Sequence, residues 1–215
     1  MQRSDRRDPT EQTLSYYEEN AGRLTAGYEA VDLSATLERI AGHLRSGARV
    51  LEIGCGSGRD AAWFLARGFE VTALDGSQAM ADRAVELHPE LADRIRVVRL
   101  PAALPFEDGA FDAVVSLATI MHLSKSAIGG VLGECRRVLT PGGVCAVSVP
   151  TSRPDLDAGG VDARGRQFTL LAAPHWDGLL RAAGLEPAEA WETDDAAGRA
   201  GIRWYTALCR VGLTG

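Results

Sequence analysis

Three glycines at alternate positions form the segment of this sequence whose chemical meaning is clearest. Residues 50–60 read Val-Leu-Glu-Ile-Gly-Cys-Gly-Ser-Gly-Arg-Asp, so that Gly54, Gly56 and Gly58 directly follow a short apolar run. Glycine has no Cβ, and this spacing lets the chain turn tightly from a strand into a helix while its backbone N–H groups approach a ligand. Because Glu52 adds a carboxylate just before the turn, the segment predicts a backbone cradle for a ligand that bears positive charge.

Two classes of nucleoside ligand bind at turns of this kind. A dinucleotide site has the spacing G-x-G-x-x-G, with a pyrophosphate on the helix N-terminus. Here Arg59 and Asp60 stand where the third glycine of that pattern is expected, and Glu52 is a poor neighbour for a pyrophosphate. S-adenosylmethionine carries a sulfonium and an ammonium but no phosphate, so an acidic neighbour suits it. Asp75, at the end of the next apolar run, either accepts the two hydroxyls of a ribose or only caps the following helix.

The chain resembles the class I S-adenosylmethionine-dependent methyltransferases in four segments. In the family's order and spacing, these are residues 50–58, 71–77, 111–123 and 139–144. The first carries E/D-x-G-x-G-x-G and the last carries L-x-P-G-G, and together they are specific for the family. The resemblance covers about residues 16–184. It implies S-adenosylmethionine as cofactor, S-adenosylhomocysteine as product, and methyl transfer to an O, N or S atom of a small molecule.

The resemblance also implies roles for individual residues at the cofactor. The backbone of Gly54 and Gly56 receives the methionine end, Glu52 orients the turn, and Asp75 holds the ribose. Arg59 faces the carboxylate of the cofactor, or else lies on the solvated surface of its helix. The other implied contacts are Gly76, Ser77 and Met80 along the adenine, Leu117 beneath the methionine moiety, and Tyr17 as a lid.

Tyr17 lies in a polar N-terminal segment that is expected to be helical. An aromatic face attracts a sulfonium, and a phenolic hydroxyl can bond a carboxylate, so a lid role is physically reasonable. The alternative is that Tyr17 only packs an amphipathic helix onto the domain.

The chain departs from the family after the third expected strand. Where the family often has Gly-Asp-Ala, this sequence has Arg99, Leu100 and Pro101. Leu100 cannot accept a hydrogen bond from the adenine amine, and Pro101 has no N–H. Either Ala102, next to Pro101, donates from its backbone, or apolar contact holds the adenine.

His122 is the candidate catalytic base. It lies in the loop after the fourth expected strand, which borders the methyl group in this family, and histidine titrates near neutral pH. The alternative is that His122 caps the next helix or shapes the cavity. In-line displacement at a carbon activated by a sulfonium needs no metal, and no set of residues has metal-ligand spacing.

Arg164 and Arg166 are the candidate substrate-binding residues. They flank Gly165 in the segment where this family's substrate lid forms, and arginine can clamp a carboxylate with two bonds. The alternative is that both are solvated loop charges. Trp176, Trp204 and Tyr205 either line the methyl-acceptor cavity or pack in the core.

Alternating apolar runs and helical windows predict the elements that position these residues. An α/β, Rossmann-like domain is expected, with a seven-stranded mostly parallel sheet, an antiparallel C-terminal edge hairpin, helices on both faces and an N-terminal helical lid. Residues 1–9 are expected to be a flexible lead, 10–46 the N-terminal helices, and 47–215 the cofactor-binding domain. The expected helices span 10–22, 33–44, 61–66, 77–87, 124–139 and 174–183, and the strands 49–53, 69–74, 95–100, 111–117, 144–149, 185–192 and 202–211.

Composition limits the partners and the location. The 215 residues are 46% hydrophobic and carry a net charge of −6, which disfavours binding to nucleic acid. The absence of a long apolar run, of a signal segment and of C-x-x-C pairs predicts a cytoplasmic protein without a membrane segment, a disulfide framework or a zinc ribbon. A monomer or a homodimer is expected. The alternative functions are an NAD-linked oxidoreductase and a cofactor-binding relative that transfers no methyl group.

Overall fold

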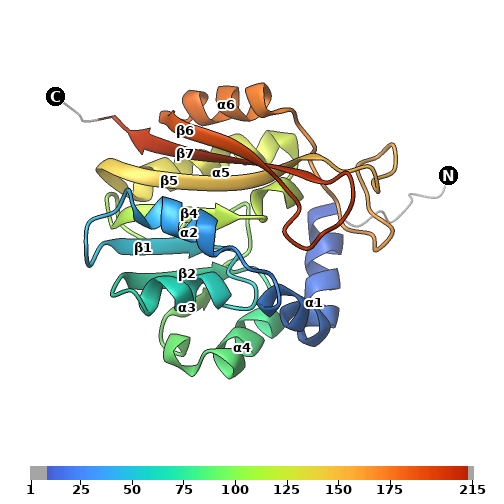
Figure 1. The fold of residues 1–215 in the computed structure, drawn as a ribbon, viewed down its shortest axis with the longest axis horizontal. Coiled ribbons are helices and arrows are strands. Elements are labelled where there is room, and N and C mark those ends of the chain that lie inside the picture. The colour runs from blue at the N-terminus through green and yellow to red at the C-terminus, as the bar shows by residue number, and fades with distance from the viewer. Residues whose placement is uncertain (1–8, 213–215) are drawn as a thin grey trace.

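Seven strands form one sheet in the part of the chain that the computed structural model describes, residues 9–212. They are β1 (Arg49–Ile53), β2 (Glu70–Asp75), β3 (Ile95–Val97), β4 (Phe111–Leu117), β5 (Leu139–Ser152), β6 (Leu185–Asp194) and β7 (Arg203–Val211). Their order is β3-β2-β1-β4-β5-β7-β6, with β7 antiparallel to both of its neighbours and the other pairs parallel (Figure 1). The predicted α/β sheet with an antiparallel edge hairpin is confirmed.

Helices cover both faces of the sheet because its strands are apolar on both sides. Val50 belongs to a buried cluster with residues of α2 (Ser34–Ala41) and α3 (Arg59–Leu65). The next residue, Leu51, belongs to a second cluster, with residues of α5 (Lys125–Val138) and α6 (Ala173–Ala182). β1 thus contributes side chains to two cores, as expected of a central strand of a parallel sheet that reads as a continuous apolar run. The remaining helices are α4 (Gln78–Leu87), η1 (Pro89–Leu91) and η2 (Ile120–His122).

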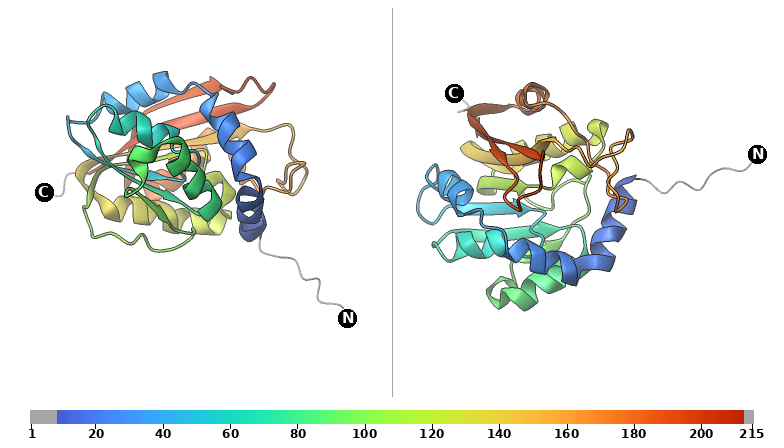
Figure 2. Two further views of the ribbon diagram at one scale, coloured as in Figure 1. Left: turned by 90° about the horizontal axis from the view of Figure 1, so that it is seen from below. Right: turned by 45° about the vertical axis from the view of Figure 1, so that its right-hand side comes forward.

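The N-terminal helix α1 (Pro9–Glu29) is longer than predicted. It continues through the exposed Gly22 because Leu24 and Thr25, which follow it, are buried, and it also passes through the exposed Gly27. Tertiary packing therefore overrides the low helix propensity of glycine. Figure 2 shows α1 lying across one end of the sheet, and Figure 1 shows that the parallel strands point to this end. Neither α1 nor any other helix within residues 9–212 is both long and apolar enough to cross a bilayer.

Two predicted boundaries concern this N-terminal part of the chain. Residues 1–8 of the expected flexible lead lie outside the described residues, and Pro9 begins α1 instead. The expected border between residues 46 and 47 falls in the connection between α2 and β1 and stays a prediction.

The neighbouring strands β1 and β4 mark the place where the strand order reverses. Chain segments leave this point in opposite directions along the sheet, so the loops after β1 and β4 face each other across an opening. Ala118, directly after β4, has φ +59°, a left-handed conformation that few residues other than glycine adopt. The fold therefore places the glycine turn and the loop that contains His122 side by side.

Candidate functional site

A cavity of about 520 Å³ opens at the carboxyl ends of β1, β2 and β4. Its other walls come from α1, the loop after β5 and the turn between β6 and β7. The carboxyl ends of the parallel strands meet at this edge, where ligands of such sheets bind. Most residues predicted from the sequence line it: Tyr17, Glu52, Gly54, Gly56, Arg59, Asp75, Gly76, Met80, Leu117, His122, Arg164 and Arg166.

The turn after β1 has the backbone geometry that its glycines predict. Gly54, Gly56 and Gly58 have φ angles of +78°, +57° and +83°, in the left-handed region that favours glycine. The N–H of Gly54 donates to the carbonyl of Leu74 at 2.7 Å, which ties the turn to β2. A Cβ on Gly54 would lie only 2.1 Å from Oγ1 of Thr119, so the loops after β1 and β4 approach each other too closely for any side chain there.

The carboxylate of Glu52 is buried in the cavity wall without a full set of partners. Glu52 is 3% exposed, and its Oε2 makes no hydrogen bond within the described part of the chain. Burial raises the pKa of this carboxyl, and the nearby Asp60 raises it further. A bound cation would supply the missing partner. The wall therefore fits a ligand with ammonium and sulfonium groups and does not fit a pyrophosphate.

Asp75 joins the glycine turn to α4. Its Oδ2 accepts the N–H of Gly56 and its Oδ1 accepts the N–H of Ser77, both at 2.9 Å. Burial raises the pKa of this carboxyl, and the backbone hydrogen bonds oppose that rise. The side-chain cap of α4 is Ser77, whose Oγ accepts the N–H of Met80 at 3.1 Å. Because Asp75 lines the cavity, its remaining lone pairs can accept ribose hydroxyls.

Three predicted cofactor contacts lie outside the cavity wall. Ser77 is buried, and its hydroxyl donates to Oε2 of Glu18 at 2.6 Å while its oxygen caps α4. Pro101 and Ala102 are exposed and do not line the cavity. The chain after β3 reaches the cavity earlier than predicted, because β3 ends at Val97 rather than at residue 100. The residues that line the cavity there are Val98, Arg99 and Leu100.

Side chains from the body of the domain hold α1 over the cavity. Near its middle, Glu18 accepts the hydroxyl of Ser77 at the N-terminus of α4. At its end, Nη1 of Arg59 donates to the carbonyls of Tyr28 at 2.6 Å and Val31 at 3.0 Å. Arg59 thus adds a side-chain donor at the end of α1, where the Tyr28 carbonyl also accepts the N–H of Val31 at 3.1 Å. The Arg59 guanidinium also pairs with Asp60 at 2.7 Å and lines the cavity, so it does not lie on a solvated helix surface, and a contact with the cofactor carboxylate stays a prediction.

Tyr17 and His122 are hydrogen-bonded across the cavity, between α1 and η2. Nδ1 of His122 lies 2.7 Å from the carbonyl of Gln167, which can only accept, so Nδ1 carries the proton. In the neutral ring Nε2 is then the acceptor, and the Tyr17 hydroxyl donates to it at 2.9 Å. Nη1 of Arg166 lies 3.3 Å from the same hydroxyl oxygen. Both ring nitrogens of the candidate base are therefore engaged.

His122 stays neutral over the physiological pH range. Burial lowers the pKa of its imidazole from the ordinary 6.5 to about 4, and the charges of Arg166 and Arg153 lower it as well. The unfolded chain therefore takes up a proton on His122 below pH 6.5 that the folded protein binds only near pH 4. We expect this group to stabilise the fold fully above pH 6.5 and to lose on the order of 3 kcal/mol as the pH falls to 4.

Urea denaturation at several pH values measures this contribution. The free energy of unfolding of the parent should approach that of His122→Gln as the pH falls from 7 to 4, because glutamine does not titrate. A difference between the two proteins that is independent of pH would contradict the expected pKa.

The loop after β5 carries buried charged and aromatic side chains. Asp162 accepts from Nε and Nη2 of Arg166 at 2.9 and 2.6 Å. The guanidinium carbon of Arg153 lies 4.1 Å from the ring centroid of Phe168, a cation–π contact. These four residues are each at most 7% exposed. Of the two arginines predicted to bind an acid, Arg166 is thus paired within the protein, whereas Arg164 is exposed at the cavity.

Tyr28 is a lining residue that the sequence patterns did not single out. It follows Thr13, Tyr17 and Leu24 at helical spacing, and all four line the cavity. Because the predicted helix ends at Gly22, Leu24 and Tyr28 fall outside its helical spacing. Burial raises the pKa of the Tyr28 phenol, and a hydrogen bond with the Tyr17 hydroxyl contributes. Other lining residues not predicted are Thr119, Met121, Arg153, Phe168, Asp195 and Arg199.

Of the three aromatic residues considered near the C-terminus, one lines the cavity and two lie in the hydrophobic core. Trp204 lines the cavity, and its Nε1 donates to Asp195 at 2.9 Å. Trp176 and Tyr205 belong to the hydrophobic core instead.

The segment that contains the glycine turn matches a family model described as a methyltransferase domain, over residues 51–147. The ubiquinone biosynthesis O-methyltransferase of Psychrobacter cryohalolentis is 32% identical over 147 residues, which are 66% of this chain and 53% of that protein. The 27-O-demethylrifamycin SV methyltransferase of Amycolatopsis mediterranei is 33% identical over 179 residues, which are 74% of this chain and 65% of that protein. The chain thus spans between about half and two thirds of the length of these relatives.

Solved structures share the fold over nearly the whole chain. One is the 1,6-didemethyltoxoflavin-N1-methyltransferase of Burkholderia thailandensis with bound 1,6-didemethyltoxoflavin and S-adenosylhomocysteine. It has a TM-score of 0.71 and 26% identity, covering 94% of this chain and 87% of that one. The [4+2]-cyclase SpnF has the same fold, with a TM-score of 0.73 at 19% identity, covering 95% and 97%. The glycine turn with its two acidic residues, the family model, the relatives and the 26% identical methyltransferase structure all support assigning the chain to the class I S-adenosylmethionine-dependent methyltransferase superfamily.

Proposed function

We propose that this protein transfers a methyl group from S-adenosylmethionine to a small-molecule acceptor. The observation that carries the proposal is the buried Glu52 carboxylate beside the glycine turn, with an oxygen that has no partner among the described residues. A cationic ligand without phosphate satisfies this oxygen, whereas a dinucleotide would bring two more negative charges to it. The matches to methyltransferases support the same cofactor and reaction.

The cofactor takes its place along the carboxyl ends of β1 and β2. The backbone of Gly54 and Gly56 and the Glu52 carboxylate receive the methionine end, and Asp75 receives the ribose hydroxyls. Gly76 lies at the ribose and adenine. Apolar side chains hold the adenine ring, since no acidic side chain follows β3 at the cavity: Met80, Val98 and Leu100. Leu117, at the end of β4, lies beneath the methionine moiety.

The residues at the other side of the cavity position the methyl acceptor and receive its proton. When bound, S-adenosylmethionine supplies a methyl group activated by its sulfonium. The helix α1 covers the cavity and keeps water from the reacting atoms. Because Tyr17 occupies the acceptor nitrogen of His122, a proton leaving the methyl acceptor passes to the Tyr17 oxygen while the Tyr17 proton moves to Nε2 of His122. In this proposal His122 acts as the base through Tyr17, and its lowered pKa makes it a weak one.

Neither alternative function has an observation that favours it over methyl transfer. An NAD-linked oxidoreductase requires room for a pyrophosphate at the glycine turn, where Glu52 lies buried. The fold alone does not exclude different chemistry, because the [4+2]-cyclase SpnF has the same fold. Only an assay for transferred methyl groups separates this last alternative from the proposal.

Calorimetry followed by a transfer assay tests the proposal. S-adenosylhomocysteine and S-adenosylmethionine should bind the full chain, and NADH should not. The loaded protein is then incubated with isotope-labelled S-adenosylmethionine and a panel of phenols, thiols, amines and carboxylic acids, and methylated products are detected by mass spectrometry. Binding of NADH in preference to S-adenosylhomocysteine would refute the proposal. Cofactor binding without transfer to any compound would favour the relative with different chemistry.

A further inference from the structure

The cavity has two ends of opposite charge. At the glycine turn, the carboxylates of Glu52 and Asp75 line the wall. At the other end, the loop after β5 brings the guanidinium groups of Arg153, Arg164 and Arg166 to the wall. The acidic end matches the cationic cofactor, which leaves the arginine-rich end for the methyl acceptor.

Most guanidinium groups at this end already have a carboxylate partner within the protein. Their Nη2 atoms lie 2.6 to 2.7 Å from a carboxylate oxygen, and these pairs build the wall rather than offer a free fork to a ligand. The turn between β6 and β7 contributes the last of them. The pairs are Arg153 with Asp155, Arg166 with Asp162, and Arg199 with Asp195.

Arg164 differs from these arginines because its guanidinium makes no hydrogen bond or ion pair with any described residue. Its backbone is nevertheless held in place: Oδ1 of Asp162 accepts the N–H of Arg164 and the N–H of Arg166, both at 3.0 Å. Gly165, with φ +82°, makes the turn between them. The carboxylate that pairs with Arg166 thus presents Arg164 at the cavity, where it is exposed and lines the wall.

The same end of the cavity disfavours a cationic methyl acceptor. The charges of Arg166 and Arg153 join burial in lowering the pKa of His122 to about 4, so a proton on this imidazole is already unfavourable. An ammonium group near His122 would meet the same positive charges. The acidic side chains of the turn between β6 and β7 do not offset them, because Asp195 is paired with Arg199 and Asp194 lies 2.9 Å from Arg203.

We propose that the methyl acceptor carries a carboxylate and that Arg164 binds it. A planar guanidinium donates two parallel hydrogen bonds to a carboxylate, and one unpaired positive charge balances one negative charge. Met121, Phe168 and Trp204 supply apolar walls for the remainder of the molecule. This inference rests on the proposed function, because it takes the acidic end of the cavity to be filled by the cofactor.

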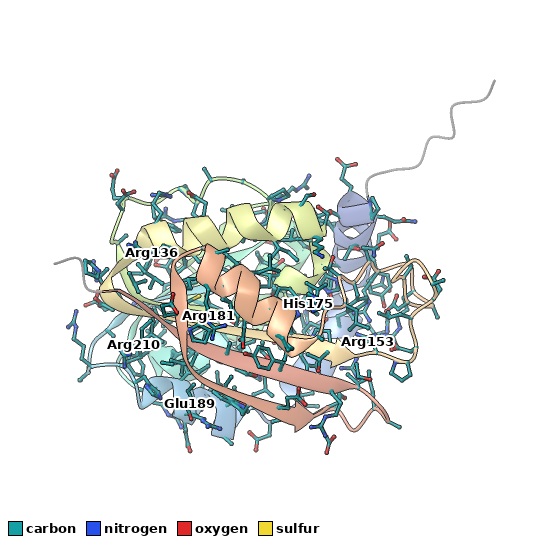
Figure 3. All side chains as sticks on the ribbon, turned by 90° about the horizontal axis from the view of Figure 1, so that it is seen from above. Arg136, Arg153, His175, Arg181, Glu189 and Arg210 are labelled. Carbon is teal, nitrogen blue, oxygen red and sulfur yellow. The ribbon has the colours of Figure 1, made fainter. Side chains whose placement is uncertain are left out.

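The test measures binding to the full chain saturated with S-adenosylhomocysteine. The probes are benzoate, 4-hydroxybenzoate, indole-3-acetate and hexanoate, each compared with its neutral methyl ester and with the corresponding primary amine, by ligand-observed NMR and calorimetry. Arg164→Gln removes the charge, and Arg181→Gln is the matched control. Arg181 lies on α6, away from the loop that carries Arg153 (Figure 3), and does not line the cavity.

We expect at least one acid to bind more tightly than its ester and its amine. Arg164→Gln should weaken the binding of that acid about 10-fold while leaving the affinities for the ester and for S-adenosylhomocysteine unchanged. Arg181→Gln should change none of these affinities. Preferential binding of esters or amines, an acid preference that survives in Arg164→Gln, or a panel in which no acid binds would each overturn the inference. A parent protein that fails to bind S-adenosylhomocysteine would instead refute the proposed function.

Discussion

Asp75→Asn is expected to weaken the binding of S-adenosylhomocysteine about 100-fold. The carboxylate accepts the N–H of Gly56 with one oxygen and the N–H of Ser77 with the other, and an amide can accept with only one. The substitution therefore leaves one of these N–H groups without its partner and removes the charged acceptor for the ribose hydroxyls. It disturbs the glycine turn and the ribose contact together, which is why a large effect is expected from an isosteric change.

Calorimetric titration with S-adenosylhomocysteine measures this effect. Asp93→Asn is the matched control, because Asp93 is exposed and does not line the cavity. A thermal unfolding curve of each protein establishes that Asp75→Asn is folded at the temperature of the titration. An affinity within about threefold of the parent would show that Asp75 does not hold the ribose.

Gly54→Ala is expected to destabilise the protein by about 3 kcal/mol and to abolish cofactor binding. An alanine at φ +78° is strained, and its Cβ would lie 2.1 Å from Oγ1 and 2.7 Å from Cβ of Thr119. The Cβ of Thr119 cannot be moved by rotating its side chain, so the backbone after β1 or β4 must shift. Either shift moves the N–H groups that form the cradle.

Gly129→Ala is the matched control for this substitution. Gly129 lies in α5, is exposed, and has open space where a Cβ would be placed. Alanine there should stabilise the protein by about 0.5 to 1 kcal/mol, because glycine in a helix interior loses more backbone entropy on folding. Chemical denaturation of both variants and the parent gives the comparison. Equal stabilities for Gly54→Ala and the parent would mean that the turn is not packed as described.

Residue patterns along the chain predicted the fold and the end of the cavity that the glycine turn forms. The glycine turn, Glu52 and Asp75 lie within one strand–helix–strand unit, so their positions follow from local geometry alone. The alternation of apolar runs with helical windows likewise predicted the parallel part of the sheet, because parallel strands need a connecting helix. The last two strands have no helix between them, which predicted the antiparallel edge. The ends of elements were less predictable. α1 passes through Gly22 because burial of Leu24 stabilises the helix beyond it, whereas the glycine itself predicts an end to the helix.

Hydrogen bonds between residues far apart in the sequence determine the features of the site that these patterns did not predict. Arg59 bonds the end of α1, Ser77 bonds Glu18, and His122 bonds Tyr17, a residue 105 positions away. Which polar groups form hydrogen bonds depends on how helices and loops pack. The sequence around a polar residue does not identify which of several possible partners it will bond. The same holds for charge: a chain with a net charge of −6 gathers arginines at one end of a cavity because the loop after β5 and the turn between β6 and β7 converge there. Local spacing therefore specifies the backbone cradle and the acids beside it, whereas packing between distant segments decides which side chains remain free to meet a ligand.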